Sequence, residues 1–360
     1  MNPTDTAAPR PVSIFRRRWR KFRALKRGWY SFLLLAGAYF LSFFLFLLVS
    51  DRAIAVHYEG QTYFPAFAAT FEGRIYQARD FGQRAIGETN YRTLAKTFAS
   101  DSASENWILL PPYPYSPTES LLRELPGNPP HGPSLEHWCG TDDRGRDVFA
   151  RLAYGFRISI SFALGVVALS YAFGAMIGAI LGYFGGRIDF LGGRVVEIWA
   201  ALPFLYTIII ISSIVQPTMT MLVVLLAAFG WIGISFYIRG EFYREKTRDY
   251  VAAAIAQGES NASVIFRHIL PNSLTPVISF APFAIVGSIG SLVSLDFLGF
   301  GLPPPTPSWG ELVSQGLANI RKWHLVLFPL GALFGTLLMV VFVGEAIREA
   351  FDPKVQARLR

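Results

Sequence analysis

The sequence predicts an all-α membrane protein with six transmembrane helices and a large outer segment after the first helix. Two observations predict this fold class. Of the 360 residues, 52% are apolar and only 16% are charged, whereas a soluble domain usually carries about 25% charged residues. The chain also contains long stretches without any charged residue, and a helix needs about 20 apolar residues to cross a membrane.

The charge-free stretches give the predicted helices in order. They are 28–50, 158–186, 198–238, 269–295 and 325–344. The third stretch is long enough for two helices. Pro217 divides it, because proline lacks the N–H group that a helix interior needs, and we expect 215–218 to form a tight turn. The five stretches therefore predict six transmembrane helices.

Lys and Arg are distributed unevenly around these stretches. The cluster Arg16–Lys21 precedes the first one, where acidic residues are almost absent. If the N-terminus is cytoplasmic, nearly all basic residues outside the long segment 51–157 fall on inner segments, which is the usual bias. The pattern therefore predicts cytoplasmic N- and C-termini, and basic residues that face a membrane rather than nucleic acid. The first stretch exceeds the roughly 7–15 apolar residues of a cleaved signal peptide, so we expect it to stay as an anchor.

These assignments divide the chain into five parts. They are a basic cytoplasmic N-terminus (1–28), a first transmembrane anchor (29–50), an outer segment (51–156), a five-helix core (157–347) with a cytoplasmic loop (240–272), and a cytoplasmic tail (348–360).

Small residues recur at helical spacing in two of the predicted helices. Gly174, Gly178 and Gly182 are four residues apart, as are Gly331 and Gly335. Small residues at this spacing let two helices approach closely in a membrane, so we expect both sets to pack against neighbouring helices. Cys139 is the only cysteine, and we expect it to be a small packing residue.

The outer segment is rich in turns and ends in a charged run, 142–147. The run could be a calcium loop, but it lacks a glutamate at the twelfth position of such a loop. We favour a structural role, with Asp and Arg side chains paired across a turn.

The sequence of the cytoplasmic loop predicts two short helices joined by a glycine turn. Asp249 is a candidate N-cap, and alanines, which favour helix, follow it. Gly258 suits the left-handed position after a helix. Ser260 can cap a second helix, and we expect Pro271 to end it. An ordinary surface hairpin would show the same pattern.

Three motifs resemble the permeases of binding-protein-dependent ABC importers. Ala253, Ala254, Gly258 and Leu270-Pro271 match the family's "EAA" loop, although Ala252 stands where the family usually has glutamate. The segment 137–159 resembles the signature of dipeptide and oligopeptide permeases, and 294–311 matches a third motif. The residues of the third motif, together with the long outer segment, most resemble the Yej-type permeases, which are associated with uptake of microcin C and other peptides in Gram-negative bacteria.

The resemblance implies an ABC importer permease fold in the bacterial inner membrane. It also implies a coupling loop that contacts a separate ATPase through the matched positions and their neighbours: Tyr250, Ala253, Ala254, Gly258, Ser260, Leu270 and Pro271. The implied periplasmic signature residues are Gly140, Thr141, Asp142, Gly145, Arg146 and Asp147.

The chain has no phosphate-binding Gly-x-x-x-x-Gly-Lys-Ser/Thr motif. We therefore expect a non-catalytic subunit without a cofactor or metal of its own, with ATP and Mg²⁺ on the partner ATPase. The resemblance adds a second homologous permease, which makes a heterodimer, and a periplasmic peptide-binding protein. The expected cargo is oligopeptides, including microcin C-like or cationic peptides.

Asp296 and Glu197 lie at the ends of predicted helices. Acidic residues at membrane depth often line a water-filled path, which would suit a cationic peptide. The alternative is that each is capped or paired at the interface. An ion-coupled carrier is an alternative class, but its usual intramembrane charges and inverted repeats are not evident. Dipeptide and nickel ABC permeases remain alternatives within the same class.

Overall fold

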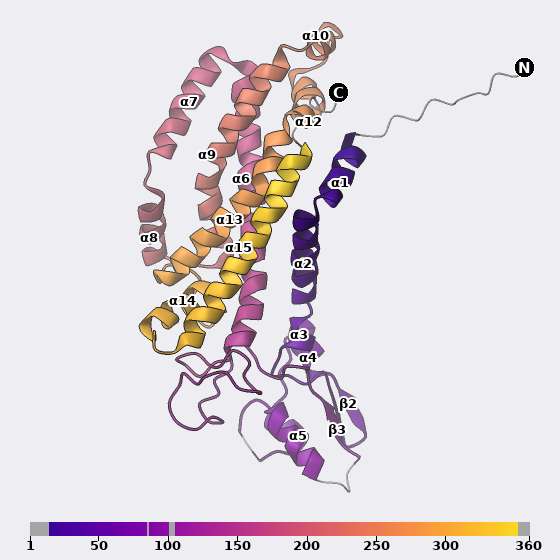
Figure 1. Cartoon of the computed structure of the whole chain (residues 1–360), viewed down its shortest axis with the longest axis vertical. Coiled ribbons are helices and arrows are strands. Elements are labelled where there is room, and N and C mark those ends of the chain that lie inside the picture. The colour runs from indigo at the N-terminus through magenta and orange to yellow at the C-terminus, as the bar shows by residue number, and fades with distance from the viewer. Residues whose placement is uncertain (1–13, 85, 101–104, 352–360) are drawn as a thin grey trace, which may run out of the picture.

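The computed structural model describes residues 14–84, 86–100 and 105–351. Residues 352–360 of the predicted cytoplasmic tail lie outside the described residues, as does the start of the basic N-terminus. The described chain is mostly helical, as predicted, and forms an elongated bundle with a small separate layer at one end (Figure 1).

Four helices among the described residues are long and apolar enough to cross a membrane. They are α6 (Val148–Phe184), α9 (Met219–Lys246), α13 (Thr275–Phe297) and α15 (Trp323–Phe351). A fifth span is possible if α7 (Gly186–Ala200) and α8 (Phe204–Ile214) cross as one unit, although they are bent by 64° at the break between them.

The predicted count of six spans is therefore not confirmed. The first predicted helix consists of α2 (Lys26–Ser42), which has 17 residues, and a separate turn, α3 (Leu45–Leu48). At 1.5 Å per residue, α2 is about 26 Å long, which is slightly short for a hydrocarbon core of about 30 Å. The segment 187–197, which we assigned to a cytoplasmic connection, is helical and belongs to α7.

The break between α7 and α8 has a local cause. Pro203 precedes the first residue of α8, and a proline disfavours helical backbone at the residue before it. The turn at 215–218 forms as predicted, because α8 ends at Ile214 and the Thr218 hydroxyl accepts a hydrogen bond from the Met221 N–H at 3.2 Å.

The closest helix pair is α6 and α9, and the predicted glycines make the contact. A Cβ atom on Gly178 would lie 2.4 Å from the Ser235 carbonyl oxygen, and one on Gly174 would lie 2.5 Å from the Trp231 carbonyl oxygen. No larger residue fits at these positions without separating the helices. Gly331 and Gly335 have no atom within 4 Å of a Cβ position, so their predicted packing partner is not found within the described chain.

The outer segment forms a small layer that the sequence did not predict as a sheet. Strand β1 (Ala55–Tyr58) lies between β2 (Gln61–Tyr63) and β3 (Trp107–Leu109), and both pairings are antiparallel. Val56 pairs with Tyr63 on one side and Ile108 on the other. Around the sheet lie α4 (Pro65–Phe67), the π-helical turn η1 (Ala68–Glu72), the 3₁₀ turn η2 (Ala78–Phe81) and α5 (Tyr91–Ser100).

The basic N-terminal helix, α1 (Ile14–Ala24), packs on the end of α15. Phe22 is buried there against Val343, Ala346 and Ala350. The Lys21 ammonium donates to the Glu349 carbonyl oxygen at 2.6 Å, where a cation is favoured because helix C-termini carry partial negative charge. The outer layer and the loop that follows α9 lie at opposite ends of the bundle (Figure 1).

Candidate functional site

The loop after α9 is the first candidate site, and it begins with α10 (Asp249–Ala256). Arg248, rather than the predicted Asp249, occupies the N-cap position, and Asp249 lies in the first turn. An acidic residue there still complements the positive end of the helix. Val251 and Ala254 are buried against Ile238 and Phe242 of α9, so one face of α10 is fixed to the bundle.

Gly258 forms the turn of the hairpin, as the sequence predicted. Its φ of +80° lies in the left-handed region, where a side chain is unfavourable. Its N–H donates to the Ile255 carbonyl oxygen, and the Glu259 N–H donates to that of Ala254. The turn is exposed, and nothing lies within 4 Å of a Cβ position on Gly258. The glycine is therefore required by the backbone angle and not by crowding.

The second arm of the hairpin, residues 261–273, continues almost directly into the next long helix, α13. It consists of α11 (Asn261–Ser263), the π-helical η3 (Val264–Ile269) and α12 (Leu270–Ser273). The Ser260 hydroxyl accepts from the Ser263 N–H at 3.3 Å, which is the predicted cap. Our expectation that Pro271 ends the arm is wrong. Pro271 is the second residue of α12, which continues η3 without a break, so the helical stretch passes through the proline.

An acid at the turn is bound to the second arm, and the sequence analysis did not find it. Glu259 accepts from the Ser263 hydroxyl at 2.5 Å and bonds the His268 ring at 2.9 Å. These two hydrogen bonds lower the pKa of Glu259 below its usual value. Tyr250 similarly donates to Glu245 at 3.0 Å. Carboxylates four to nine residues from their partners are the only sequence signal for these contacts.

The predicted coupling residues divide into two groups. Ala254 faces the bundle, and Leu270 is half-buried, whereas Tyr250, Ala253, Gly258 and Pro271 are exposed. Two further exposed apolar residues belong to this surface, Ile255 at 51% and Phe266 at 58%. The matched positions of the family motif do not include these two residues, so the sequence did not single them out as contact residues.

The periplasmic signature residues come together in a buried charged cluster beside the start of α6. Gly140 and Gly145 both have positive φ, which allows tight turns around Thr141 and Asp142. Asp142 accepts from the Arg146 N–H at 2.8 Å and from the Arg146 guanidinium at 2.7 Å. This pairing of Asp and Arg across a turn agrees with the role that we favoured over a calcium loop.

Glu311 links this loop to two distant helices. It lies in α14 (Trp309–Ala318) and accepts hydrogen bonds from Arg146 at 2.9 Å and from Arg151 of α6. Although burial raises the pKa of Glu311, Arg151 and Arg146 together hold it below its usual value. Arg151 is fully buried, so the cluster joins α6 and α14 through charges removed from water.

Asp147 starts α6 and closes the same cluster. One carboxylate oxygen accepts from the Ala150 N–H at 2.8 Å as an N-cap, and the other accepts from the Tyr113 hydroxyl at 2.6 Å and bonds the His137 ring at 2.9 Å. Nearby Cys139 is buried, and burial raises the pKa of its thiol to about 11. Within the described residues no group of three or more His, Cys, Asp or Glu side chains is placed to hold a metal ion.

Asp296 and Glu197 have separate surroundings. Asp296 is enclosed by the loop after α13, where its two oxygens accept from the Leu302 N–H at 2.7 Å and the Ser308 hydroxyl at 2.6 Å. Glu197 is exposed on α7 and pairs with Arg194 at 2.6 Å. Both geometries match the capped or paired alternative rather than a free acid that faces a path.

Comparison with known proteins identifies the class. Residues 174–357 match the family described as the binding-protein-dependent transport system inner membrane component. The chain is also 37% identical to the inner membrane ABC transporter permease protein YejE of Escherichia coli K12, over 93% of this chain and 96% of the relative. The chain belongs to this permease family.

Two other relatives extend the comparison. The permease is 38% identical to the peptidoglycan transport system permease protein YejE of Agrobacterium fabrum, over 94% of this chain and 93% of the relative. It is 35% identical to the dipeptide transport system permease protein DppC of Alkalihalophilus pseudofirmus, over 68% of this chain and 81% of the relative. The predicted resemblance to Yej-type and dipeptide permeases is thereby confirmed.

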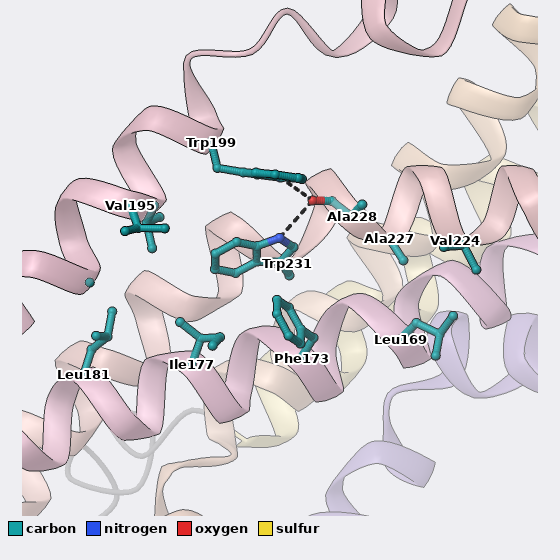
Figure 2. A pocket seen from close by; sticks show the side chains of 12 residues that line it. Leu169, Phe173, Ile177, Leu181, Val195, Trp199, Val224, Ala227, Ala228 and Trp231 are labelled. Atoms are coloured by element: carbon teal, nitrogen blue, oxygen red, sulfur yellow. Dashed lines mark hydrogen bonds between the residues drawn. The ribbon is translucent and has the colours of Figure 1, made fainter. Parts of the chain in front are cut away.

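The permease also contains an apolar cavity of about 740 Å³ between α6, α7 and α9, which the sequence analysis did not predict (Figure 2). The indole N–H groups of Trp199 and Trp231 both donate to the Ala228 carbonyl oxygen, at 2.7 and 2.8 Å. Both indole donors are therefore occupied, and the wall is otherwise almost wholly aliphatic or aromatic. Such a lining is a poor match for the polar backbone of a peptide.

Proposed function

We propose that this chain is the transmembrane permease subunit of an ATP-driven importer that moves peptides from the periplasm to the cytoplasm by alternating access. Its family membership supports the ABC class over an ion-coupled carrier. The printed names of the relatives support a peptide or peptidoglycan-derived cargo. We extend this to oligopeptides, including microcin C-like or cationic peptides, and keep a dipeptide or nickel importer as the alternative within the class.

The hairpin of residues 249–273, which consists of α10, the Gly258 turn and the second arm and is called the coupling hairpin below, carries the proposal. Its buried residues Val251, Ala254, Val264, Ile265 and Ile269 share one core cluster with the ends of α6 and α9. A push on the exposed Gly258 turn would therefore be transmitted to two long helices through close packing. The subunit itself is non-catalytic in this scheme, and ATP and Mg²⁺ act on a separate ATPase seated against the hairpin.

The hairpin and the outer layer lie at opposite ends of the bundle (Figure 1), which suits partners on opposite sides of the membrane. With cytoplasmic termini, the hairpin meets the ATPase in the cytoplasm and the outer layer faces a periplasmic peptide-binding protein. A second, homologous permease completes a heterodimer. Ala252 removes the usual glutamate, so the shape of the turn and the exposed side chains Ile255 and Phe266 would supply the contact.

Gly258→Val tests this proposal. The left-handed backbone at φ +80° resists a β-branched side chain, so the turn must change shape. We expect normal insertion of the chain in the membrane, loss of the ATPase on co-purification, and a loss of ATP-driven peptide uptake in proteoliposomes of at least tenfold. Ala262→Val is the matched control, because it adds the same side chain to an exposed helical position of the same hairpin.

Normal uptake by Gly258→Val would contradict the coupling role. A loss of the same size in Ala262→Val would show that any added bulk on the hairpin is harmful, and the special role of the turn would then fail. Uptake of dipeptides but not of longer peptides by the unmodified complex would instead favour the alternative cargo.

A further inference from the structure

The short segment after β2 exposes three phenylalanines. Phe64 is 51% exposed, Phe67 39% and Phe71 73%. Exposed aromatic rings are unfavourable in water, so this face would gain free energy on burial. The opposite face of the segment is already used, because Ala66 and Ala68 are buried beneath the outer layer. The segment is thus amphipathic, with its free apolar face pointing away from the layer.

This apolar face continues that of the first helix. The Phe46 ring of α3 contacts the rings of Phe67 and Phe71 edge-on, with centroids 5.4 and 5.7 Å apart. The Phe67 and Phe71 rings are stacked on each other at 6.4 Å. Above them, α2 and the break before α3 expose Phe40, Phe43 and Phe44. One apolar surface therefore runs from a helix at the edge of the bundle onto the outer layer.

The segment lies level with one end of a helix that is long and apolar enough to cross a membrane. Figure 1 shows α4 directly below α3, near the height at which α15 begins. The first residue of α15 is Trp323, which is 56% exposed, and tryptophan is enriched at membrane interfaces. Arg74 follows the phenylalanines and is exposed with its guanidinium 4.7 Å from the centre of the Tyr76 ring. A basic side chain beside aromatic rings suits the headgroup level of a bilayer, because long Arg side chains near the ends of spans extend to the interface.

We propose that Phe64, Phe67 and Phe71 insert into the outer leaflet of the membrane and anchor the outer layer to it. An interfacial segment of this kind buries its apolar face at the boundary between headgroups and acyl chains. Lipid is favoured over a protein partner because the three exposed large side chains are all phenylalanines, which carry no hydrogen-bonding group, whereas protein hot spots favour Tyr, Trp and Arg. The anchor would hold the outer layer at a fixed height above the bundle. This inference needs only the family's place in the membrane, and not the coupling role of the hairpin.

Lipid contact can be measured with a bimane label on Phe71→Cys in a Cys139→Ala background, in the full complex in nanodiscs. We expect brominated phospholipids to quench this label at least threefold more than a label on Thr97→Cys, and aqueous iodide to quench it at least threefold less. Thr97 is the matched control, because it is exposed on α5 of the same layer. Phe64→Cys repeats the measurement if Phe71→Cys yields little folded protein.

Each other outcome overturns the proposal. Strong iodide quenching at 71, equal to that at 97, would place the segment in water. Protection from both quenchers would mean that a protein covers the segment, such as the second permease or the periplasmic receptor. ATP-driven uptake by the labelled complexes shows that the comparison is made on working transporters. If Gly258→Val abolishes uptake, or fails to do so, the quenching result is unaffected, so the two proposals fail separately.

Discussion

Single buried charges hold the outer end of this permease together. Arg151 is fully buried, and its partners Glu311 and Asp142 come from parts of the chain that are distant from each other in sequence. Removing one member of a buried ion pair leaves the other charge without a partner, which typically costs about 3–5 kcal/mol. An exposed pair contributes about 0–1 kcal/mol. We therefore expect a substitution in this buried cluster to lower the free energy of unfolding much more than a substitution in an exposed ion pair.

We predict that Arg151→Met strongly lowers stability, by about 3–5 kcal/mol. The matched control is Arg194→Met, which removes the exposed pair with Glu197 and should cost at most about 1 kcal/mol. Melting midpoints of the detergent-solubilised protein give the comparison. Adding Glu311→Gln to Arg151→Met should recover part of the loss, because it removes the uncompensated charge. No recovery would indicate that lost packing, not charge, is responsible.

Asp296 allows a second test at this scale. Both of its oxygens accept hydrogen bonds from the following loop, and Asn would present an N–H₂ group to one of these donors. We predict that Asp296→Asn lowers the melting midpoint and reduces uptake of cationic and neutral peptides by the same factor. A loss confined to cationic peptides would favour the path role that the sequence left open.

At the scale of elements, the contact between α6 and α9 is the rigid centre of the bundle. Three glycines of α6 lie directly on the backbone of α9, and the coupling hairpin packs on the end of this same pair. In the proposed mechanism, a movement of the hairpin would move both helices together. The π-helical η3 and α12 carry the second arm on towards α13, so the hairpin also adjoins a third span.

We predict that Gly178→Leu destabilises the permease, because a Cβ atom there would lie 2.4 Å from the Ser235 carbonyl oxygen. Overpacking of this kind usually costs about 1–3 kcal/mol. Gly331→Leu is the control, since no atom lies within 4 Å of its Cβ position. Melting of the isolated chain should show a loss for the first variant only. Equal losses would mean that helix propensity or expression, rather than the α6–α9 contact, sets the effect.

At the scale of the whole molecule, the bent pair α7–α8 decides the topology. If the pair crosses the membrane, the turn at 215–218 lies outside and the hairpin inside. If it re-enters, the turn lies inside, and α9 carries the hairpin to the outside. The basic residues of 187–197 and of the hairpin favour crossing.

We predict that a membrane-impermeant maleimide labels Gln216→Cys in intact spheroplasts and labels Gln257→Cys only after permeabilisation. Both side chains are exposed. The native Cys139 should remain unlabelled at pH 8, because a pKa of about 11 leaves very little of the reactive thiolate. Labelling of Gln216→Cys only after permeabilisation would show a re-entrant pair and would overturn the predicted orientation of the later helices.

The sequence alone determined the features that depend on consecutive residues. Hydropathy located the apolar segments, the glycine spacing predicted the α6 contact, and backbone preferences predicted the turn at Gly258. These are local properties, summed over one helix or one turn. The EAA-type motif then pointed to the family, which the comparisons confirmed.

Only the tertiary structure decided which distant residues meet. Arg151 and Glu311 are 160 positions apart, and the rings that join α3 to η1 belong to different layers of the molecule. The sheet of the outer layer and the surroundings of Asp296 likewise depend on residues that are not adjacent in the chain. Contacts of this kind have no periodic signal in the sequence, because their energy comes from burial and pairing through space rather than from the preferences of adjacent residues.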